Sequence, residues 1–177
     1  MSTKHDPASA DASPTLKVRL GKDGRPIGAS AVARIEHPVA RVWAVVTDMG
    51  YARYLPMVHR VHRSGDHVTF DLKFKVGFLS AGFQFTAHAT YEAERWLELR
   101  WTAGEPRDIR LRFSLTSIDE GRACLVEGDG EFDIQSLGWL VKYFLKNHPE
   151  IQFGVFPGVA LVLIDSLRRA VAARGSG

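Results

Sequence analysis

The middle of this chain is a succession of short segments in which apolar and polar residues alternate. These segments cover residues 68–76, 83–91, 97–101, 109–115 and 123–134. Strict alternation gives a strand one buried face and one solvated face, which is typical of antiparallel sheets. Turn-forming residues separate the segments, in the stretches 64–66, 77–82, 104–106 and 119–121. The sequence therefore predicts a meander of antiparallel strands with one apolar face.

Helical patterns flank this meander on both sides. After strands predicted over 16–20 and 30–36, apolar residues recur at helical spacing from Val39 to Val46, directly after Pro38. Proline suits the first position of a helix because its missing N–H has no partner there. We expect this helix to end near Gly50, since glycine favours a left-handed cap.

The C-terminal part, from about residue 137 to 174, is helical in pattern and divides at Asn147–Pro149. Pro157 is expected to bend the longer second segment away from the strands, because it removes one helical hydrogen bond. A single curved sheet has to cover its apolar face, and this helix is the element long enough to do so. The sequence predicts an α+β fold, with a curved antiparallel sheet wrapped around a long C-terminal helix.

Composition and charge narrow the functional classes. Hydrophobic residues make up 45% and charged residues 24% of the 177 residues, as in ordinary globular domains. The net charge of +3 is too small to indicate a DNA-binding surface. Cys124 is the only cysteine, which excludes an intramolecular disulfide, and we expect it to be a buried core residue.

Residues 1–15 are rich in Ala, Ser, Asp and Pro and are predicted to form a disordered leader. Residues 16–174 are predicted to form a single domain. The first residues have no apolar core of the kind a signal peptide needs, and the longest apolar run, 155–164, is too short to span a membrane. We therefore expect a cytoplasmic protein.

Two stretches carry a resemblance to a known superfamily. The sequence ARIEHPVARVWAVVTD at 33–48, followed by Tyr54-Leu-Pro56, resembles the opening of START-like, Bet v1-like (SRPBCC) proteins. The stretch EGDGEFD at 127–133 is similar to the polyketide cyclase/dehydrase branch, which includes Coq10-like ubiquinone-binding proteins. The resemblance implies a helix-grip fold that encloses an apolar cavity for a lipid, quinone, sterol or polyketide. The strand and turn at 16–26 and the break at 147–149 depart from the usual pattern, so ligand identity does not transfer.

The alternation sorts side chains into an inward and an outward set. Eleven apolar or aromatic residues are expected to line the cavity: Trp43, Tyr54, Phe70, Phe74, Phe85, Leu99, Trp101, Phe113, Phe132, Phe156 and Leu161. We place its centre beneath Trp43, Phe74, Phe85 and Trp101. The sheet wall supplies no titratable group, which favours binding over acid–base catalysis. A solid core without a cavity is the structural alternative.

Charged residues on the outward face suggest a solvated ladder. Arg110 and Arg112 alternate on one predicted strand, and Glu127, Asp129 and Glu131 alternate on the next. Neighbouring antiparallel strands place such residues opposite each other. The functional alternative is that Glu127 faces inward and anchors a polar group of the ligand.

Three histidines, His59, His62 and His67, lie close together in the sequence. The odd spacing of the first two puts them on opposite faces of a strand, so we expect no metal site. Arg60 and Arg63 add positive charge to what is expected to be a solvated edge strand.

Three functions remain open at this point. The first is a binder or carrier of a quinone, isoprenoid, lipid or polyketide-like molecule, with no cofactor. The second is a polyketide cyclase or aromatase, in which Tyr54, Asp48 and Asp165 serve as acid or base; Gln152 is a further polar candidate at a cavity end. The third is a protein that docks on RNA, ribosomes or a membrane surface through the basic 59–67 segment. Whether a reaction is catalysed, and the oligomeric state, stay open.

Overall fold

The computed structural model describes residues 13–76, 79–148 and 150–174. Its elements, in chain order, are β1 (Thr15–Leu20), β2 (Pro26–Ile35), α1 (Val39–Thr47), η1 (Ala52–Tyr54), β3 (Val58–Ser64), β4 (His67–Val76), β5 (Leu79–Glu92), β6 (Trp96–Gly104), β7 (Arg107–Ile118), η2 (Asp119–Gly121), β8 (Ala123–Asp133), η3 (Ile134–Ser136), α2 (Gly138–Asn147) and α3 (Ile151–Ala173). Most of the leader predicted at 1–15 lies outside the described residues.

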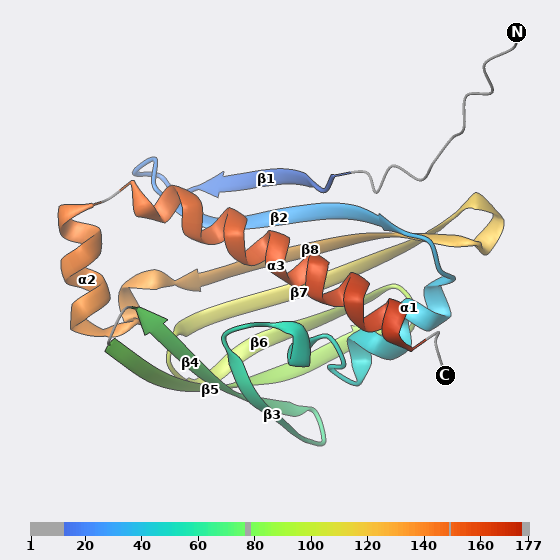
Figure 1. Ribbon diagram of the computed structural model, residues 1–177, viewed down its shortest axis with the longest axis horizontal. Coiled ribbons are helices and arrows are strands. Elements are labelled where there is room, and N and C mark those ends of the chain that lie inside the picture. The colour runs from blue at the N-terminus through green and yellow to red at the C-terminus, as the bar shows by residue number, and fades with distance from the viewer. Residues whose placement is uncertain (1–12, 77–78, 149, 175–177) are drawn as a thin grey trace, which may run out of the picture.

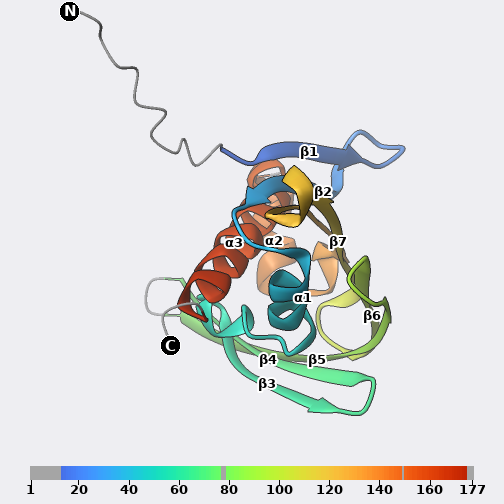
Figure 2. The same cartoon turned by 90° about the vertical axis from the view of Figure 1, so that its right-hand side faces the viewer.

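A single eight-stranded sheet has the order β1-β2-β8-β7-β6-β5-β4-β3. From β3 to β8 each strand pairs antiparallel with the next. β2 lies beside β8 and is also antiparallel to it. The sheet curves around the helices (Figure 2), while α3 crosses its concave face and α1 and α2 lie at opposite ends (Figure 1). The predicted α+β helix-grip architecture is confirmed.

Two boundaries differ from the prediction. β5 begins at Leu79, so the linker predicted over 77–82 is too long; Gly82 lies within the ladder opposite Lys73. β2 begins at Pro26 rather than at residue 30, because it pairs with β1 along most of the length of that strand. Glycine and proline indicate turns in a sequence, but both are tolerated in strands that neighbouring elements hold in place.

The end of α1 also differs from the prediction in detail. Pro38 is the N-cap rather than the first helical residue. At the C-terminus the left-handed residue is Met49, with φ of 58°, and not Gly50. The N–H of Gly50 donates to Val45 O at 3.0 Å and that of Met49 to Val46 O at 3.4 Å, which is a Schellman motif. Burial of the Met49 side chain offsets the cost of its backbone conformation.

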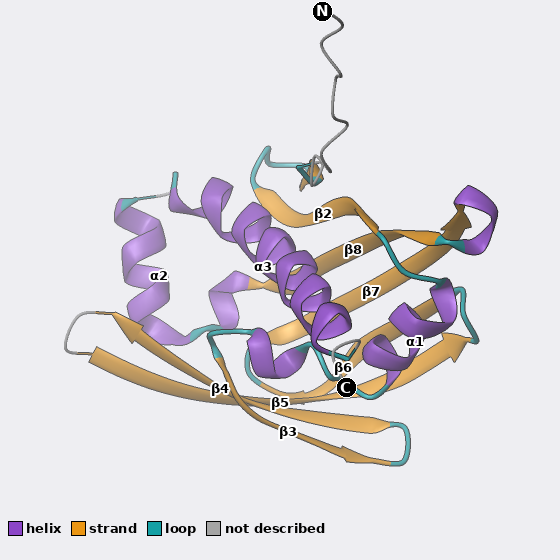
Figure 3. Cartoon of the chain, turned by 45° about the vertical axis from the view of Figure 1, so that its right-hand side comes forward, coloured by secondary structure: helices purple, strands orange, loops and turns teal. Residues whose placement is uncertain are grey.

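Small residues let α3 approach the sheet closely. Ala31 and Ala33 are buried on β2, against which α3 packs. A Cβ at Gly128 on β8 would lie 3.4 Å from Cδ1 of Ile164. Figure 3 shows α3 running over these strands as one unbroken helix, although Pro157 lies inside it. The bend predicted at Pro157 stays a prediction.

By length and hydropathy alone, α3 is long and apolar enough to cross a membrane. The sequence prediction considered only the apolar run 155–164, which is shorter than this helix. A core helix of a globular domain passes the same test. Nine residues of α3 are buried inside this fold, from Gln152 to Val171. Its apolar character is therefore also what packing against the sheet requires.

The convex face of the sheet carries the predicted charge ladder, in a larger form. Arg110 Nη1 lies 3.4 Å from Glu131 Oε1, and Arg110 Nε donates to Glu98 Oε2 at 3.1 Å. Arg19 of β1 extends the ladder, pairing with Glu131 at 2.9 Å and also with Asp129. The sequence does not predict Glu98 or Arg19 as members of the ladder, because alternation within one strand does not show which residues of other strands lie beside it.

Glu127 lies on the same convex face. It alternates with Val126 and Gly128, which are buried on the concave side. The alternative in which Glu127 faces the cavity is therefore wrong, since successive residues of a strand point to opposite faces.

Glu98 is the most buried carboxylate of this ladder, at 4% exposed. Burial alone would raise the pKa of Glu98, but hydrogen bonds from Arg100 and Arg110 outweigh it and hold this pKa below its usual value. Because the carboxylate is favoured in the folded state, its contribution to stability is present above the unfolded pKa of about 4.3 and is lost as the pH falls through the lowered folded value.

We therefore expect Glu98→Gln to lower the free energy of unfolding at pH 7 by about 1–3 kcal/mol, because it weakens the charge-assisted hydrogen bonds that the buried Glu98 carboxylate accepts from Arg100 and Arg110. The difference from wild type should shrink as the pH falls below 4. Urea unfolding at several pH values measures both effects. Glu94→Gln, at an exposed position, is the control and should change little. A loss independent of pH would contradict the electrostatic explanation.

Candidate functional site

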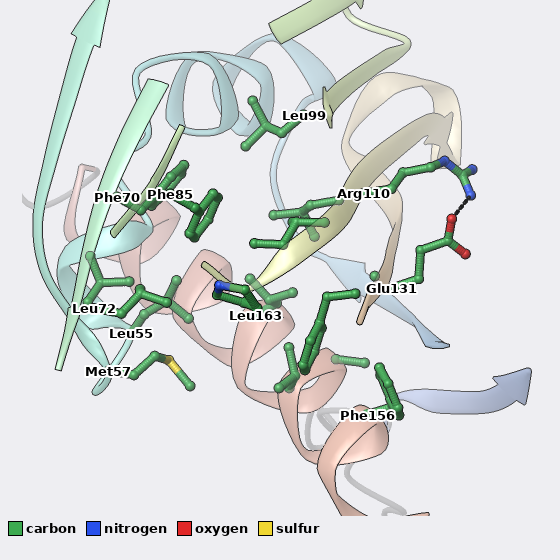
Figure 4. Close-up of a pocket in the computed structure, with 18 of the residues that line it drawn as sticks. Leu55, Met57, Phe70, Leu72, Phe85, Leu99, Arg110, Glu131, Phe156 and Leu163 are labelled. Carbon is green, nitrogen blue, oxygen red and sulfur yellow. Dashed lines mark hydrogen bonds and ion pairs between the residues drawn. The ribbon is translucent and has the colours of Figure 1, made fainter. Parts of the chain in front are cut away.

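A cavity of about 190 Å³ lies between α3 and the concave face of the sheet. Side chains from the strands, from α3 and from the connecting segments form its wall (Figure 4). The sheet contributes Ala29, Val58, Phe70, Leu72, Phe85, Leu99, Ile109, Leu111 and Phe132, among others. The helix α3 contributes Val155, Phe156, Val159, Ala160 and Leu163. Leu55, Met57, Pro106 and Leu137 contribute from the connecting segments.

The local sequence explains why these side chains converge. On the strands the wall residues alternate with solvated ones, so each strand sends every second side chain inward. On α3 they recur at three- and four-residue intervals, which places them on one helical face. Phe70 and Phe85 are paired across β4 and β5, and their rings stack with centroids 4.9 Å apart.

Among the wall residues that the structure describes, three carry a polar side chain: Tyr51, Arg110 and Glu131. Arg110 and Glu131 belong to the convex charge ladder, and Figure 4 shows their ion pair directed away from the apolar side chains. The parts of Arg110 and Glu131 that border the cavity are therefore not their charged groups. A void with such a lining is expected to stay dry when empty, because it offers too few polar partners to hold water.

Tyr51 is a wall residue that the sequence analysis missed. It is fully buried, its ring packs edge-on against Phe113 at 5.1 Å, and its hydroxyl lies 3.5 Å from Sδ of Met49. Burial raises the pKa of Tyr51 well above its usual value, so the phenol stays protonated at neutral pH. Nothing in the sequence distinguishes Tyr51 from Tyr54, since both stand beside the short turn that precedes β3.

The structure brings together five of the eleven predicted wall residues, namely Phe70, Phe85, Leu99, Phe132 and Phe156. The other described residues of that set lie elsewhere. Phe113 packs beneath Tyr51, and Leu161 is exposed on α3. The remaining three, Trp43, Tyr54 and Trp101, are partly buried outside the wall, and the side chain of Phe74 lies outside the described residues.

Local contacts explain two of these differences. The ring of Trp43 pairs with Tyr91 at 6.0 Å, at the α1 end of the domain. The indole N–H of Trp101 donates to the carbonyl of Gly104 at 3.1 Å, close to the end of β6. Trp43 lies on α1 and Trp101 near the end of β6, and neither helical spacing nor strand alternation fixes how far a side chain lies from the centre of the cavity.

The three residues considered for acid–base chemistry are not assembled at the cavity. Asp48 forms an ion pair with Arg174 and accepts the N–H of Gly50 at 2.8 Å, so it stabilises the end of α1. Asp165 pairs with Arg169 at 2.8 Å, and its side chain is 57% exposed. None of the three is among the wall residues.

The three histidines that lie close together in the sequence, His59, His62 and His67, are divided between β3 and β4. His59 and His62 are exposed on β3, the last strand of the sheet. His67 instead faces His88 of β5, with ring centroids 5.3 Å apart. Within the described residues, no group of three potential metal ligands was found.

Cys124 lies in the core of β8, as predicted. Burial raises the pKa of its thiol to about 11. The thiolate is therefore disfavoured near neutral pH, which fits a packing residue rather than a nucleophile.

Comparison with solved structures identifies the fold. A START superfamily protein from Mycobacterium smegmatis superposes with a TM-score of 0.56 at 16% identity, covering 81% of this chain and 96% of that one. The chain has a START-like helix-grip fold. A Thermus thermophilus protein gives a TM-score of 0.61 at 15% identity, over 82% of this chain and 97% of its own.

A third structure, the Zhui aromatase/cyclase from a Streptomyces strain, gives a TM-score of 0.53 at 15% identity and covers 90% of this chain and 98% of that one. At these identities the START-like likeness concerns the fold alone. No protein-family model and no curated protein matches the sequence. The Coq10-like branch therefore stays a prediction.

The position of a phenylalanine relative to the cavity should determine how much stability its replacement by alanine costs. Phe113 is fully buried in dense surroundings, whereas Phe85 borders the cavity. We expect Phe113→Ala to cost about 3–5 kcal/mol of unfolding free energy and Phe85→Ala distinctly less, because Phe85 has fewer atoms packed on its cavity side. Urea unfolding of the two variants measures the difference. Equal costs would mean that the space beside Phe85 is filled in solution.

Proposed function

We propose that the protein binds a hydrophobic small molecule, such as a quinone, isoprenoid, lipid or polyketide-like compound, in the cavity beneath α3. The observation that carries the proposal is the apolar wall described above, in whose described part Tyr51 is the one polar side chain not engaged in the convex ladder. Ligand pockets are mostly apolar with a few polar groups that fix orientation. The START-like fold supports the proposal, because it leaves space between sheet and helix.

The volume limits what the cavity accommodates as it stands. A cavity of about 150 Å³ holds benzene, whereas pockets for drug-sized ligands occupy about 300–1,000 Å³. At about 190 Å³, the space fits one compact ring or a short branched chain. A longer ligand has to extend beyond the cavity or displace part of its wall.

The structure favours binding over the cyclase alternative. Catalysis by Tyr54, Asp48 and Asp165 would need them within reach of a bound chain, yet none lies in the wall. The cyclase reading keeps only its fold-level motivation, since a shared fold does not establish a shared reaction. Docking on RNA or a membrane through β3 stays a prediction that would show itself as steeply salt-dependent binding.

Ala160 offers a direct test, because it is buried on α3 and lines the cavity. In wild type, a ligand at a hundredfold excess over Kd should stabilise the fold by about 2.7 kcal/mol. Ala160→Leu should fill part of the space and abolish most of this gain without unfolding the protein. Thermal unfolding with menadione, farnesol and decanoic acid measures the gain, and native mass spectrometry detects the complexes.

Ala172→Leu is the matched control, since Ala172 lies exposed on the same helix. It should bind as wild type does. If wild type gains no stability from any of the three compounds and takes up nothing from a lipid extract, the binding proposal is wrong.

A further inference from the structure

A second hollow, of about 460 Å³, opens beside the cavity where β8 ends and α3 begins. We call it the end chamber. In contrast to the cavity, its lining is mixed, with apolar residues and with the polar residues Asp23, Arg25, Asp108, Asp133, Gln135 and Gln152. Of these polar residues, the sequence indicates only Gln152 as a candidate.

Two aromatic rings separate the end chamber from the cavity. Phe132 of β8 and Phe156 of α3 line both spaces. Their ring centroids lie 4.9 Å apart, with the ring planes inclined by 45°. If a ligand displaced these rings and joined the two spaces, their combined volume would fall within the range of ligand pockets of drug size.

Gln152 lies at the base of the end chamber. It is only 3% exposed, and its side-chain amide forms no hydrogen bond with any residue that the structure describes. The amide is not sealed from the end chamber, which is open, so water can solvate it there when no ligand is bound. A ligand that supplies a donor and an acceptor at this point would take the place of that water.

The charges around Gln152 select among possible ligand groups. The acidic residues Asp23, Asp108, Glu131 and Asp133 and the basic residue Arg25 are among the described residues that line the chamber. Arg25 Nε lies 3.7 Å from Asp23 Oδ2, and the carboxylate of Glu131 pairs with arginines of the convex ladder. Asp108 and Asp133 have no ion pair with a described residue, so their negative charge disfavours an anionic group in the chamber.

We propose that the ligand is an amphiphile whose apolar part occupies the cavity and whose neutral hydroxyl-type head lies past the Phe132–Phe156 pair on the amide of Gln152. This inference rests on the proposed function. It adds that the ligand is not wholly apolar, and that fatty-acid carboxylates and phosphates are poor ligands.

Three probes with one skeleton separate these possibilities. Butylbenzene has no head, 4-butylphenol has a neutral hydroxyl, and 4-butylbenzoate carries a carboxylate at neutral pH. Calorimetry should show that 4-butylphenol binds about three- to tenfold more tightly than butylbenzene, as expected for one added hydrogen bond. The benzoate should bind most weakly.

The decisive variant is Gln152→Met, which keeps the length of the side chain and removes the amide. It should erase the advantage of 4-butylphenol and leave the Kd of butylbenzene unchanged. Without ligand it should unfold at about the same temperature as wild type, because the amide forms no hydrogen bond with the described residues. Gln84→Met, at an exposed position on β5, is the control for the exchange and should bind all three probes as wild type does.

The outcomes distinguish the two proposals. If none of the probes binds wild type, the proposed function itself fails. If all three bind with similar Kd, or if Gln152→Met leaves the preference for 4-butylphenol intact, the cavity stands and the head site is wrong. A lower unfolding temperature for ligand-free Gln152→Met would show that the amide already has a partner, which also overturns the head site.

Discussion

The packing of α3 against the concave face of the sheet is the contact on which the rest of the structure depends. It is uneven along the helix. In the C-terminal half, Ile164, Leu167 and Ala170 are fully buried, and the face they form meets the sheet where Gly128 and the alanines of β2 allow close approach. The N-terminal half, from Val155 to Leu163, faces the cavity instead. One rigid helix thus both closes the core at one end and covers a void at the other.

The charge ladder on the convex face is the counterpart of this arrangement. A sheet that curves around a helix exposes its outer face to water, and here arginine and carboxylate side chains occupy that face from β1 to β6. Each strand therefore has one charged side and one apolar side. Because of this division, the guanidinium of Arg110 and the carboxylate of Glu131 lie outside the cavity, although both residues contribute to its wall.

The sequence was sufficient for the architecture because every element has a local signal. Alternation marked each strand from β4 to β8, and the spacing of Val155, Val159 and Leu163 marked the face of α3. The boundaries were harder, because Gly82 and Pro26 act as strand residues only when a neighbouring strand holds them. Met49 could not have been predicted as the left-handed residue, since tertiary burial of its side chain decides that position.

The site was predicted only in part for a related reason. Alternation states which way a side chain points but not how far along the sheet it lies, so Phe85 and Trp101 looked equivalent, while only Phe85 reaches the cavity. The distinction between Tyr51 and Tyr54 depends on how η1 meets α3, where Ser166 Oγ donates to the carbonyl of Tyr54 at 3.1 Å. No local pattern encodes such a contact.

The apolar wall also limits where ligand polarity can be placed. A polar group buried in such a cavity would lose its hydration and gain no partner, which costs more than most apolar contacts return. Within the described residues, the phenol of Tyr51 is the only polar group of the wall that is not engaged in the convex ladder, and burial keeps it a hydrogen-bond donor. Any further polar atom of a ligand is therefore best placed outside the cavity, beyond the rings of Phe132 and Phe156. Polar side chains line the end chamber on the other side of this aromatic pair. The groups that orient a ligand can therefore lie at the boundary of the cavity rather than inside it.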